Sequence, residues 1–202
     1  MENSKIASKD SHPFEAFIPP KSKAIIIGTI PPHRFCLPNK SLKGADVDFY
    51  YGSTDNDFWR LVKKVSSHDF EINKEGIKEH LTMCGIAVAD TIKSCFRKNN
   101  SASDSDLYEI EFNDIGRILD ENPSIKTLVY TSEMVKKHVN QIFKAYHCYI
   151  SKQDRKRCKL KVGSKEYSCF ILYSPSPQAL RGIEEAKRLE QYRQIFKTLE
   201  SQ

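Results

Sequence analysis

Short apolar runs alternate with segments of helical spacing along the whole chain. Four runs are rich in β-branched or aromatic residues and have the length of buried strands: 23–27 (KAIII), 85–89 (GIAVA), 127–130 (TLVY) and 167–173 (YSCFILY). Between and after them, apolar residues recur three and four positions apart, which predicts helices at 57–65, 74–82, 112–119, 133–146 and 183–199. Strands that alternate with helices in this way are typical of an α/β fold.

The predicted strands also indicate how the layers are arranged. Strands that are apolar on both faces occur in parallel sheets, which helices cover on both sides. We therefore expect a three-layer α/β/α fold around a central, mostly parallel four-stranded sheet. A length of 202 residues fits one domain, which we place at residues 23–202. The polar residues 1–22 are expected to form an N-terminal arm.

Composition excludes several classes of protein. Hydrophobic residues make up 39% of the chain and charged residues of both signs 29%, which favours a folded globular protein. No apolar run approaches the roughly 18 residues of a membrane span, and the first residues lack the apolar segment of a secretory signal. We expect an intracellular monomer without a membrane partner, cytoplasmic and nucleoid-associated if the source is bacterial.

Cofactor sites find little support in the sequence. The six cysteines include no Cys-x-x-Cys pair, the spacing of many zinc and iron–sulfur sites, so we expect reduced thiols. Neither a Gly-x-Gly-x-x-Gly segment nor a phosphate-binding loop with its lysine is present. The sequence thus predicts no metal, no iron–sulfur cluster and no nucleotide cofactor.

The net charge of +6 favours anionic partners only weakly, but the charge is unevenly distributed. Residues 152–165 hold seven basic residues against one acid. Two interpretations of this stretch remain open. One is a solvated hairpin or loop, and the other is a patch that contacts phosphates.

Polar and proline residues follow each predicted strand. In parallel sheets ligands bind outside the carboxyl ends of the strands, so these segments are expected to lie together: 28–33 (GTIPPH), 90–91 (DT), 131–132 (TS) and 174–178 (SPSPQ). Most of their residues are small, polar or conformationally restricted, which predicts a shaped slot for a neutral planar ligand. The long loop 28–55 also has a length that is typical of functional loops.

Four segments resemble motifs of the uracil-DNA glycosylase superfamily and occur in the family's order: IIIGTIPPH (25–33), FYYGSTDNDFW (49–59), GIAVAD (85–90) and ILYSPSPQALRG (171–182). The likeness spans nearly the whole chain. It is greatest to mismatch-specific and hypoxanthine-DNA glycosylase-like members. The resemblance implies the three-layer fold of that superfamily.

The same resemblance implies a monofunctional DNA glycosylase of base excision repair. Such an enzyme hydrolyses the N-glycosidic bond of a deaminated base, uracil or hypoxanthine, that is flipped out of DNA carrying a damaged or mismatched base. This hydrolysis needs no cofactor. An alternative is a nucleic-acid-binding protein of the same fold with weak or no catalysis. Ile30 and Ser174 favour the alternative, because they stand where relatives carry stronger catalytic groups.

The catalytic residues that the resemblance implies lie in the loop 28–55 and directly after it. The family's first loop usually carries Asp or Asn where this chain has Ile30, and members without that residue use the Asn of an Asn-x-Phe-Trp segment. Asn56 would then hold the attacking water through its side-chain carbonyl, or it could cap the helix that begins there. Asp48 and Asp55, in the same loop, are the alternative catalytic groups.

The resemblance also implies a set of base-binding residues: Gly28, Thr29, Ile30, Pro31, Tyr51, Asp90 and Ser174. The backbone N–H groups of Thr29 and Ile30 would donate to a base oxygen. Tyr51 would stack on the flipped base, Asp90 would read its edge, and Ser174 would donate to it as it leaves. Core packing for Tyr51 and a turn cap for Asp90 are equally open.

The last motif supplies the residues that the resemblance places on the DNA: Ser176, Gln178, Leu180 and Arg181. Leu180 would act as an apolar wedge between bases. Arg181 would clamp a phosphate. The other interpretation is that these residues form the first turn of the last helix.

Overall fold

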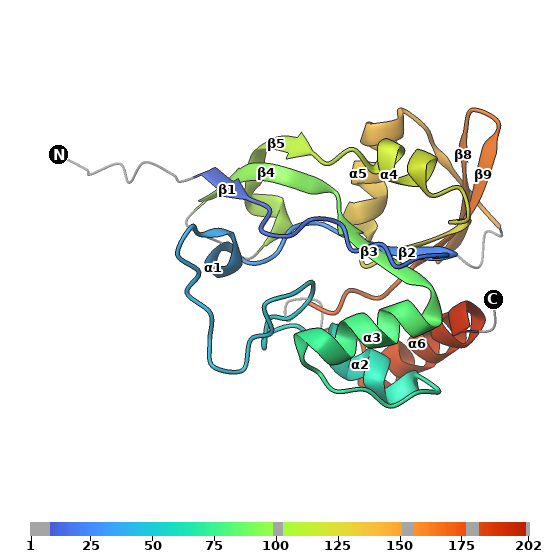
Figure 1. The fold of residues 1–202 in the computed structure, drawn as a ribbon. Helices are drawn as coiled ribbons and strands as arrows, with labels where there is room; N and C mark the ends of the chain where they lie inside the picture. Colours follow the sequence, from blue (N-terminus) through green and yellow to red (C-terminus); the bar gives the residue numbers. More distant parts are fainter. Residues whose placement is uncertain (1–8, 99–102, 151–155, 177–181, 201–202) are drawn as a thin grey trace.

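The computed structural model describes residues 9–98, 103–150, 156–176 and 182–200 of the chain. Its larger sheet has the strand order β3-β2-β6-β9-β8-β7 (Figure 1). The first four strands are mutually parallel: β3 (Ile86–Asp90), β2 (Ala24–Gly28), β6 (Thr127–Tyr130) and β9 (Lys165–Ile171). They are the four strands expected from the sequence, so the predicted central parallel sheet is confirmed.

Two antiparallel strands extend this sheet, β8 (Arg157–Val162) and β7 (His147–Tyr149). A turn at Gly163, with a φ of 59° in the left-handed region, joins β8 to β9 in a hairpin. The hairpin contains most of the basic stretch, and several of its lysines form ion pairs: Lys156–Glu133, Lys159–Glu166 and Lys165–Asp120. These pairs agree with the hairpin interpretation, whereas Lys152 and Arg155 lie outside the described residues.

Helices cover both faces of the larger sheet (Figure 1). One face carries α2 (Phe58–Val65), α3 (Lys74–Cys84) and α6 (Glu185–Glu200), and the other carries α4 (Ile115–Glu121) and α5 (Glu133–Phe143). Successive side chains of β2 point to opposite faces, so Ile26 packs in the first apolar layer and Ile25 and Ile27 in the second. The predicted three-layer α/β/α fold is therefore confirmed.

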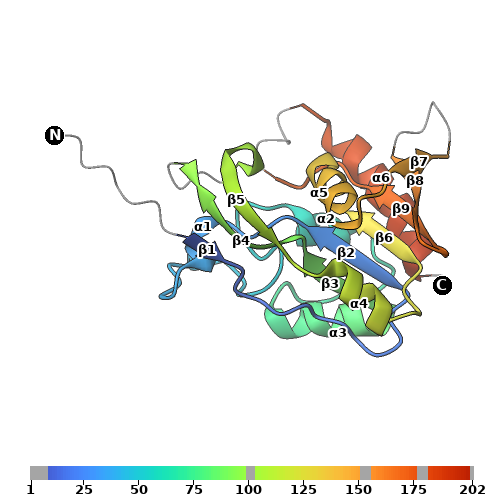
Figure 2. The same ribbon diagram turned by 90° about the horizontal axis from the view of Figure 1, so that it is seen from above.

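A smaller antiparallel sheet stands beside the first, as Figure 2 shows. It has the order β1-β4-β5, formed by β1 (Lys9–Ser11), β4 (Ile92–Arg97) and β5 (Leu107–Phe112). The sequence does not predict this sheet, because β5 is largely exposed and its apolar signal is weak. The helix expected at 112–119 begins only at Ile115, after β5 has ended at Phe112.

The described part of the predicted arm packs against the domain. β1 pairs with β4, and further on Phe17 exchanges two backbone hydrogen bonds with Val88 of β3, at 3.0 and 2.9 Å. Residues 9–17 therefore follow the edges of both sheets. The division into an arm and a domain stays a prediction.

The thiols and the helix lengths add two further facts. All six cysteines carry free thiols, and four of them are buried: Cys36, Cys95, Cys158 and Cys169. Among the helices that the structure describes, none is both long and apolar enough to cross a bilayer.

Candidate active site

A cavity of about 370 Å³ opens at the carboxyl ends of the parallel strands. Its walls include a segment at or directly after the end of each strand: residues 29–32 after β2, Asp90 of β3, residues 131–132 after β6 and residues 174–176 after β9. Loop residues between 49 and 56, and residues 103–105 ahead of β5, close the remaining sides. The volume lies near the lower end of the range for small-molecule sites.

Most of the predicted site residues line this cavity: Thr29, Ile30, Pro31, Tyr51, Asn56, Asp90, Ser174 and Ser176. Gly28 lies directly against Tyr51 and Asp90, and Asp48 is not part of the lining. Gln178, Leu180 and Arg181 lie outside the described residues, so their contact with DNA stays a prediction.

Gly28, Tyr51 and Asp90 approach one another more closely than side chains at all three positions would permit. A Cβ atom on Gly28 would lie 2.4 Å from Oδ1 of Asp90 and 2.5 Å from the Tyr51 hydroxyl oxygen. Burial raises the pKa of Tyr51 well above its usual value, so its hydroxyl stays protonated and donates to Asp90 Oδ1 at 3.5 Å. The Tyr51 ring also packs on Phe58, with ring centroids 4.4 Å apart, so Tyr51 lines the cavity and contacts the core.

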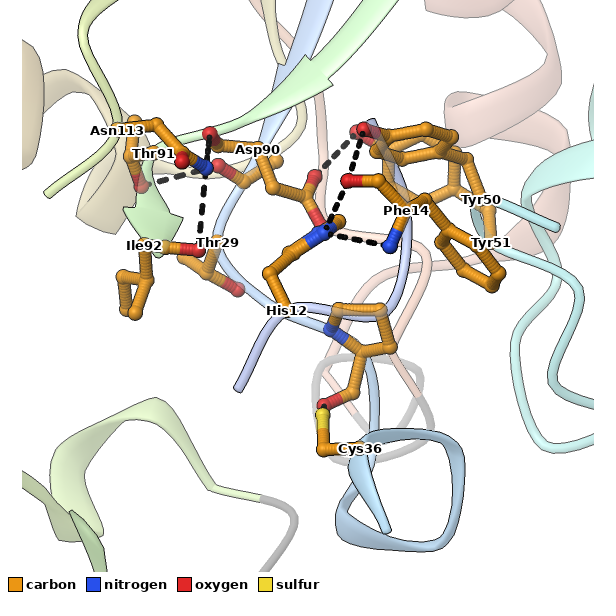
Figure 3. A network of polar contacts seen from close by, with 12 residues as sticks. His12, Phe14, Thr29, Cys36, Tyr50, Tyr51, Asp90, Thr91, Ile92 and Asn113 are labelled. Carbon is orange, nitrogen blue, oxygen red and sulfur yellow. Dashed lines mark hydrogen bonds and ion pairs between the residues drawn. The ribbon is translucent and has the colours of Figure 1, made fainter. Parts of the chain in front are cut away.

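The Asp90 carboxylate is held by a histidine from the N-terminal segment (Figure 3). His12 Nε2 lies 2.9 Å from Asp90 Oδ2, and both side chains are 4% exposed. His12 Nδ1 lies 2.8 Å from the carbonyl oxygen of Phe14, which fixes the plane of the ring. The main partners of this carboxylate are therefore side chains from distant segments, His12 and Tyr51, and not the backbone of its own turn.

Asn56 combines both of its predicted features. Its side-chain oxygen accepts a hydrogen bond from the N–H of Phe58 at 2.9 Å, at the start of α2, and the residue also lines the cavity. A carbonyl oxygen has two lone pairs, so one acceptor position remains after this bond. The next residue, Asp57, donates its N–H to the carbonyl of Pro175 at 3.1 Å, which ties the start of α2 to the opposite rim.

The two other acids of this loop are paired with cations. Asp48 accepts from Lys40 Nζ at 2.6 Å outside the cavity, and its side chain is 40% exposed. Asp55 lines the cavity and lies 2.6 Å from Lys43 Nζ and 3.2 Å from Arg34. The hydrogen bond from Lys43, together with Arg34, lowers the pKa of Asp55.

Ile30 and Ser174 bring no charge to the cavity. Ile30 is nearly buried and packs with Cys36 and Ile92 in a small apolar cluster below the smaller sheet's edge of the site. The Ser174 hydroxyl donates to Ser176 Oγ at 3.2 Å. Both residues line the cavity, yet neither supplies the acid or base that their positions would suggest.

Two residues of the site carry no signal in the sequence, His12 and Asp104. Asp104 opens a short 3₁₀ turn, η2 (Asp104–Asp106), and lines the cavity. Its Oδ1 accepts a hydrogen bond from the Thr29 hydroxyl at 3.0 Å. These contacts span 75 residues for Asp104 and 78 for His12, so no local pattern could reveal them.

Two groups of possible metal ligands lie apart from the cavity lining, within the described part of the chain: His147 with Cys158 and Cys169, and His80 with Cys84 and Glu200. Each group offers three ligand atoms within 4.8 Å of one another, whereas structural zinc sites take four. Both ring nitrogens of His147 already have partners, the Tyr130 hydroxyl at 2.9 Å and Asn140 Oδ1 at 2.6 Å.

The fold and the position of this cavity can now be compared with known proteins. No protein-family model matches the chain. The solution NMR structure of a proposed uracil DNA glycosylase from Methanosarcina acetivorans matches with a TM-score of 0.66. The match covers 96% of this chain and 99% of the other, at 18% sequence identity. The chain therefore has the uracil-DNA glycosylase-like fold.

A sequence match gives the second step. The chain is 29% identical over 85 residues to a hypoxanthine DNA glycosylase from Methanosarcina barkeri. The match covers 42% of this chain and 52% of the relative, so it spans about half the length of that protein. The predicted resemblance to the uracil-DNA glycosylase superfamily, and to its hypoxanthine-DNA glycosylase-like members, is confirmed.

Proposed function

We propose that the protein is a DNA glycosylase that hydrolyses the N-glycosidic bond of a flipped, deaminated base, uracil or hypoxanthine. One observation carries the proposal: Asp90, Tyr51 and Asn56 line a single cavity at the carboxyl ends of the parallel strands. The similarity to a hypoxanthine DNA glycosylase supports it. The enzyme would act within the cell as a monomer on DNA that carries a damaged or mismatched base.

Base recognition follows from the polar groups of the cavity. The Asp90 carboxylate is an acceptor and would bind the ring N–H that uracil and hypoxanthine share. The backbone N–H groups of Thr29 and Ile30 would donate to a base oxygen, and Tyr51 would stack on the ring. Ser174 would donate a hydrogen bond to the base as negative charge develops on it.

Hydrolysis by water, without a covalent intermediate, agrees with the residues of the cavity. Among the described residues that line it there is no lysine, the side chain that forms a Schiff base with a sugar aldehyde. Asn56 would position the attacking water through the remaining lone pair of its side-chain oxygen. This argument favours a monofunctional enzyme.

A nucleic-acid-binding protein of the same fold is the second candidate. Two observations favour it: Ile30 packs in an apolar cluster at a position where an acid is expected, and the Asn56 oxygen already accepts from Phe58. In this alternative the residues after β9, with Leu180 and Arg181, would bind DNA without base release.

The test uses labelled duplexes with a single uracil or hypoxanthine, followed by alkaline cleavage of abasic sites. We expect base release by the wild-type protein and a loss of about a hundredfold or more in Asn56→Ala, because a group that positions the reacting water contributes on that scale. Asn39→Ala, an exposed residue of the same long loop, is the matched control.

Each outcome separates the candidates. Full activity in Asn56→Ala with a loss in Asp48→Ala would move the catalytic role to Asp48. Binding of the duplexes without cleavage of either substrate would contradict the glycosylase and favour the binding protein. Loss of both binding and cleavage in wild-type protein would exclude a DNA substrate of this kind.

A further inference from the structure

Residues 103–105 form a wall of the cavity that belongs to the smaller sheet and not to the larger one. They lie in the connection between β4 and β5, where η2 begins. The segment places a carboxylate, that of Asp104, among the cavity residues. None of the roles proposed above uses this group.

Asp104 lies beside a loop that contains no acid of its own. Residues 28–32 read Gly-Thr-Ile-Pro-Pro, so the wall that follows β2 offers only one hydroxyl and backbone groups. That hydroxyl, of Thr29, donates to Asp104 Oδ1 at 3.0 Å. The hydrogen bond fixes one carboxylate oxygen against the first loop and leaves Oδ2 available as an acceptor among the described contacts.

The cavity has three carboxylates, and their partners distinguish them. Asp55 is paired with Lys43 and Arg34, and Asp90 with His12. Within the described residues, Asp104 has a hydroxyl as its partner and no cation in ion-pair contact. An unneutralised carboxylate accepts a proton more readily than one held by a lysine, because no opposite charge stabilises its ionised form.

The charges around Asp104 set the direction of its titration. Burial is the largest influence and raises the pKa of Asp104 above the usual value of an aspartate. Asp90 at the end of β3 raises it further, whereas the Thr29 hydroxyl and Arg97 of β4 lower it. The carboxylate is thereby a stronger base than an exposed aspartate.

We propose that Asp104 is a catalytic residue, the general base of base release, an inference that rests on the proposed glycosylase function. The water oxygen forms a bond to C1′ of the sugar while its proton passes to Asp104. The C1′–N bond breaks, and its electron pair leaves with the base. Solvent protonates the departing base, and Asp104 returns its proton to solvent. Asn56 and Asp104 would then contact the same water from two walls of the cavity.

The test is single-turnover base release by Asp104→Asn. The amide keeps the shape of the carboxylate and an oxygen that can accept from Thr29, so the fold is expected to survive, which urea unfolding checks. General bases contribute about 10²- to 10⁴-fold, and we expect a loss of that size at neutral pH. Asp106→Asn changes a carboxylate of the same turn that is not part of the cavity lining, and it should retain the wild-type rate.

The pH profile distinguishes a chemical role from a structural one. The wild-type rate should rise with pH as Asp104 loses its proton, with a midpoint above the usual pKa of an aspartate, and Asp104→Asn should lack this limb. A rate within threefold of wild type, or a reduced rate that keeps the limb, would overturn the proposal. Absence of base release by wild-type protein would instead overturn the glycosylase function on which the proposal rests.

Discussion

Gly28 is the position at which one added methyl group would disturb the proposed base pocket most directly. An alanine Cβ would collide with a carboxylate oxygen of Asp90 and with the Tyr51 hydroxyl. Tyr51 has little freedom to move away, because its backbone is already in the left-handed region at a φ of 54° and its ring packs on Phe58. The absence of a side chain at Gly28 therefore lets two recognition groups meet.

We predict that Gly28→Ala lowers the rate of base release at least tenfold and the free energy of unfolding by about 1–3 kcal/mol, the usual effect of overpacking. Gly44→Ala is the control, because nothing lies within 4 Å of a Cβ atom there, and surface changes of this kind stay within about 0.5 kcal/mol. Single-turnover assays and urea unfolding measure the two effects. Equal behaviour of the two variants would contradict the prediction.

At the scale of elements, β1 connects the smaller sheet to the first loop of the cavity. Asp10 of β1 is almost fully buried, with Arg97 Nε at 2.5 Å and His33 Nδ1 at 2.6 Å from its carboxylate oxygens. Arg97 in turn donates to the carbonyl oxygen of Pro31 at 2.6 Å, and Pro31 lines the cavity. A three-residue strand thus holds a wall of the site through buried charges.

Asp10→Ala should lower the free energy of unfolding by about 3–5 kcal/mol, because it removes the negative charge that faces a buried guanidinium. Asp48→Ala breaks the exposed pair with Lys40 and should cost at most about 1 kcal/mol. Urea unfolding of both variants gives the comparison. An effect of Asp10→Ala as small as that of Asp48→Ala would show that β1 adds little to stability.

The parallel strands could be predicted from the sequence, and the smaller sheet could not. All five residues of β2 are buried, so its whole apolar run is visible in the sequence. By contrast, β4 mixes buried and exposed residues and has register shifts in its pairing with β5, which interrupt the alternation expected of a strand. Physical burial on both faces is what made the larger sheet legible.

The same limit applies to the site. Residues next to strand ends, such as Thr29 and Asp90, were expected in the cavity because the topology of a parallel sheet brings strand ends together. His12 and Asp104 reach the cavity through β1 and through the β4–β5 connection, and neither segment was expected to form part of a sheet. Their contributions follow from tertiary packing and not from a local pattern.

For the whole molecule, the two apolar layers share one sheet, since neighbouring residues of β2 belong to different layers. Neither layer can lose its packing while the sheet that supports both stays intact. We predict a single unfolding transition in urea, with coincident curves from far-ultraviolet circular dichroism and from the fluorescence of Trp59, the only tryptophan, which is buried in the first layer. Separate midpoints for the two probes would show that the layers unfold independently.

The wide separation of the cavity walls along the chain has a consequence for protein synthesis. One wall begins at Thr29, and another is formed by residues 174–176, after β9. Because a ribosome releases the chain from its N-terminus, β2 and β3 emerge long before the strand that brings Ser174 into place. A nascent chain can therefore pair its first parallel strands early, but it has no closed cavity until its last strand has left the exit tunnel.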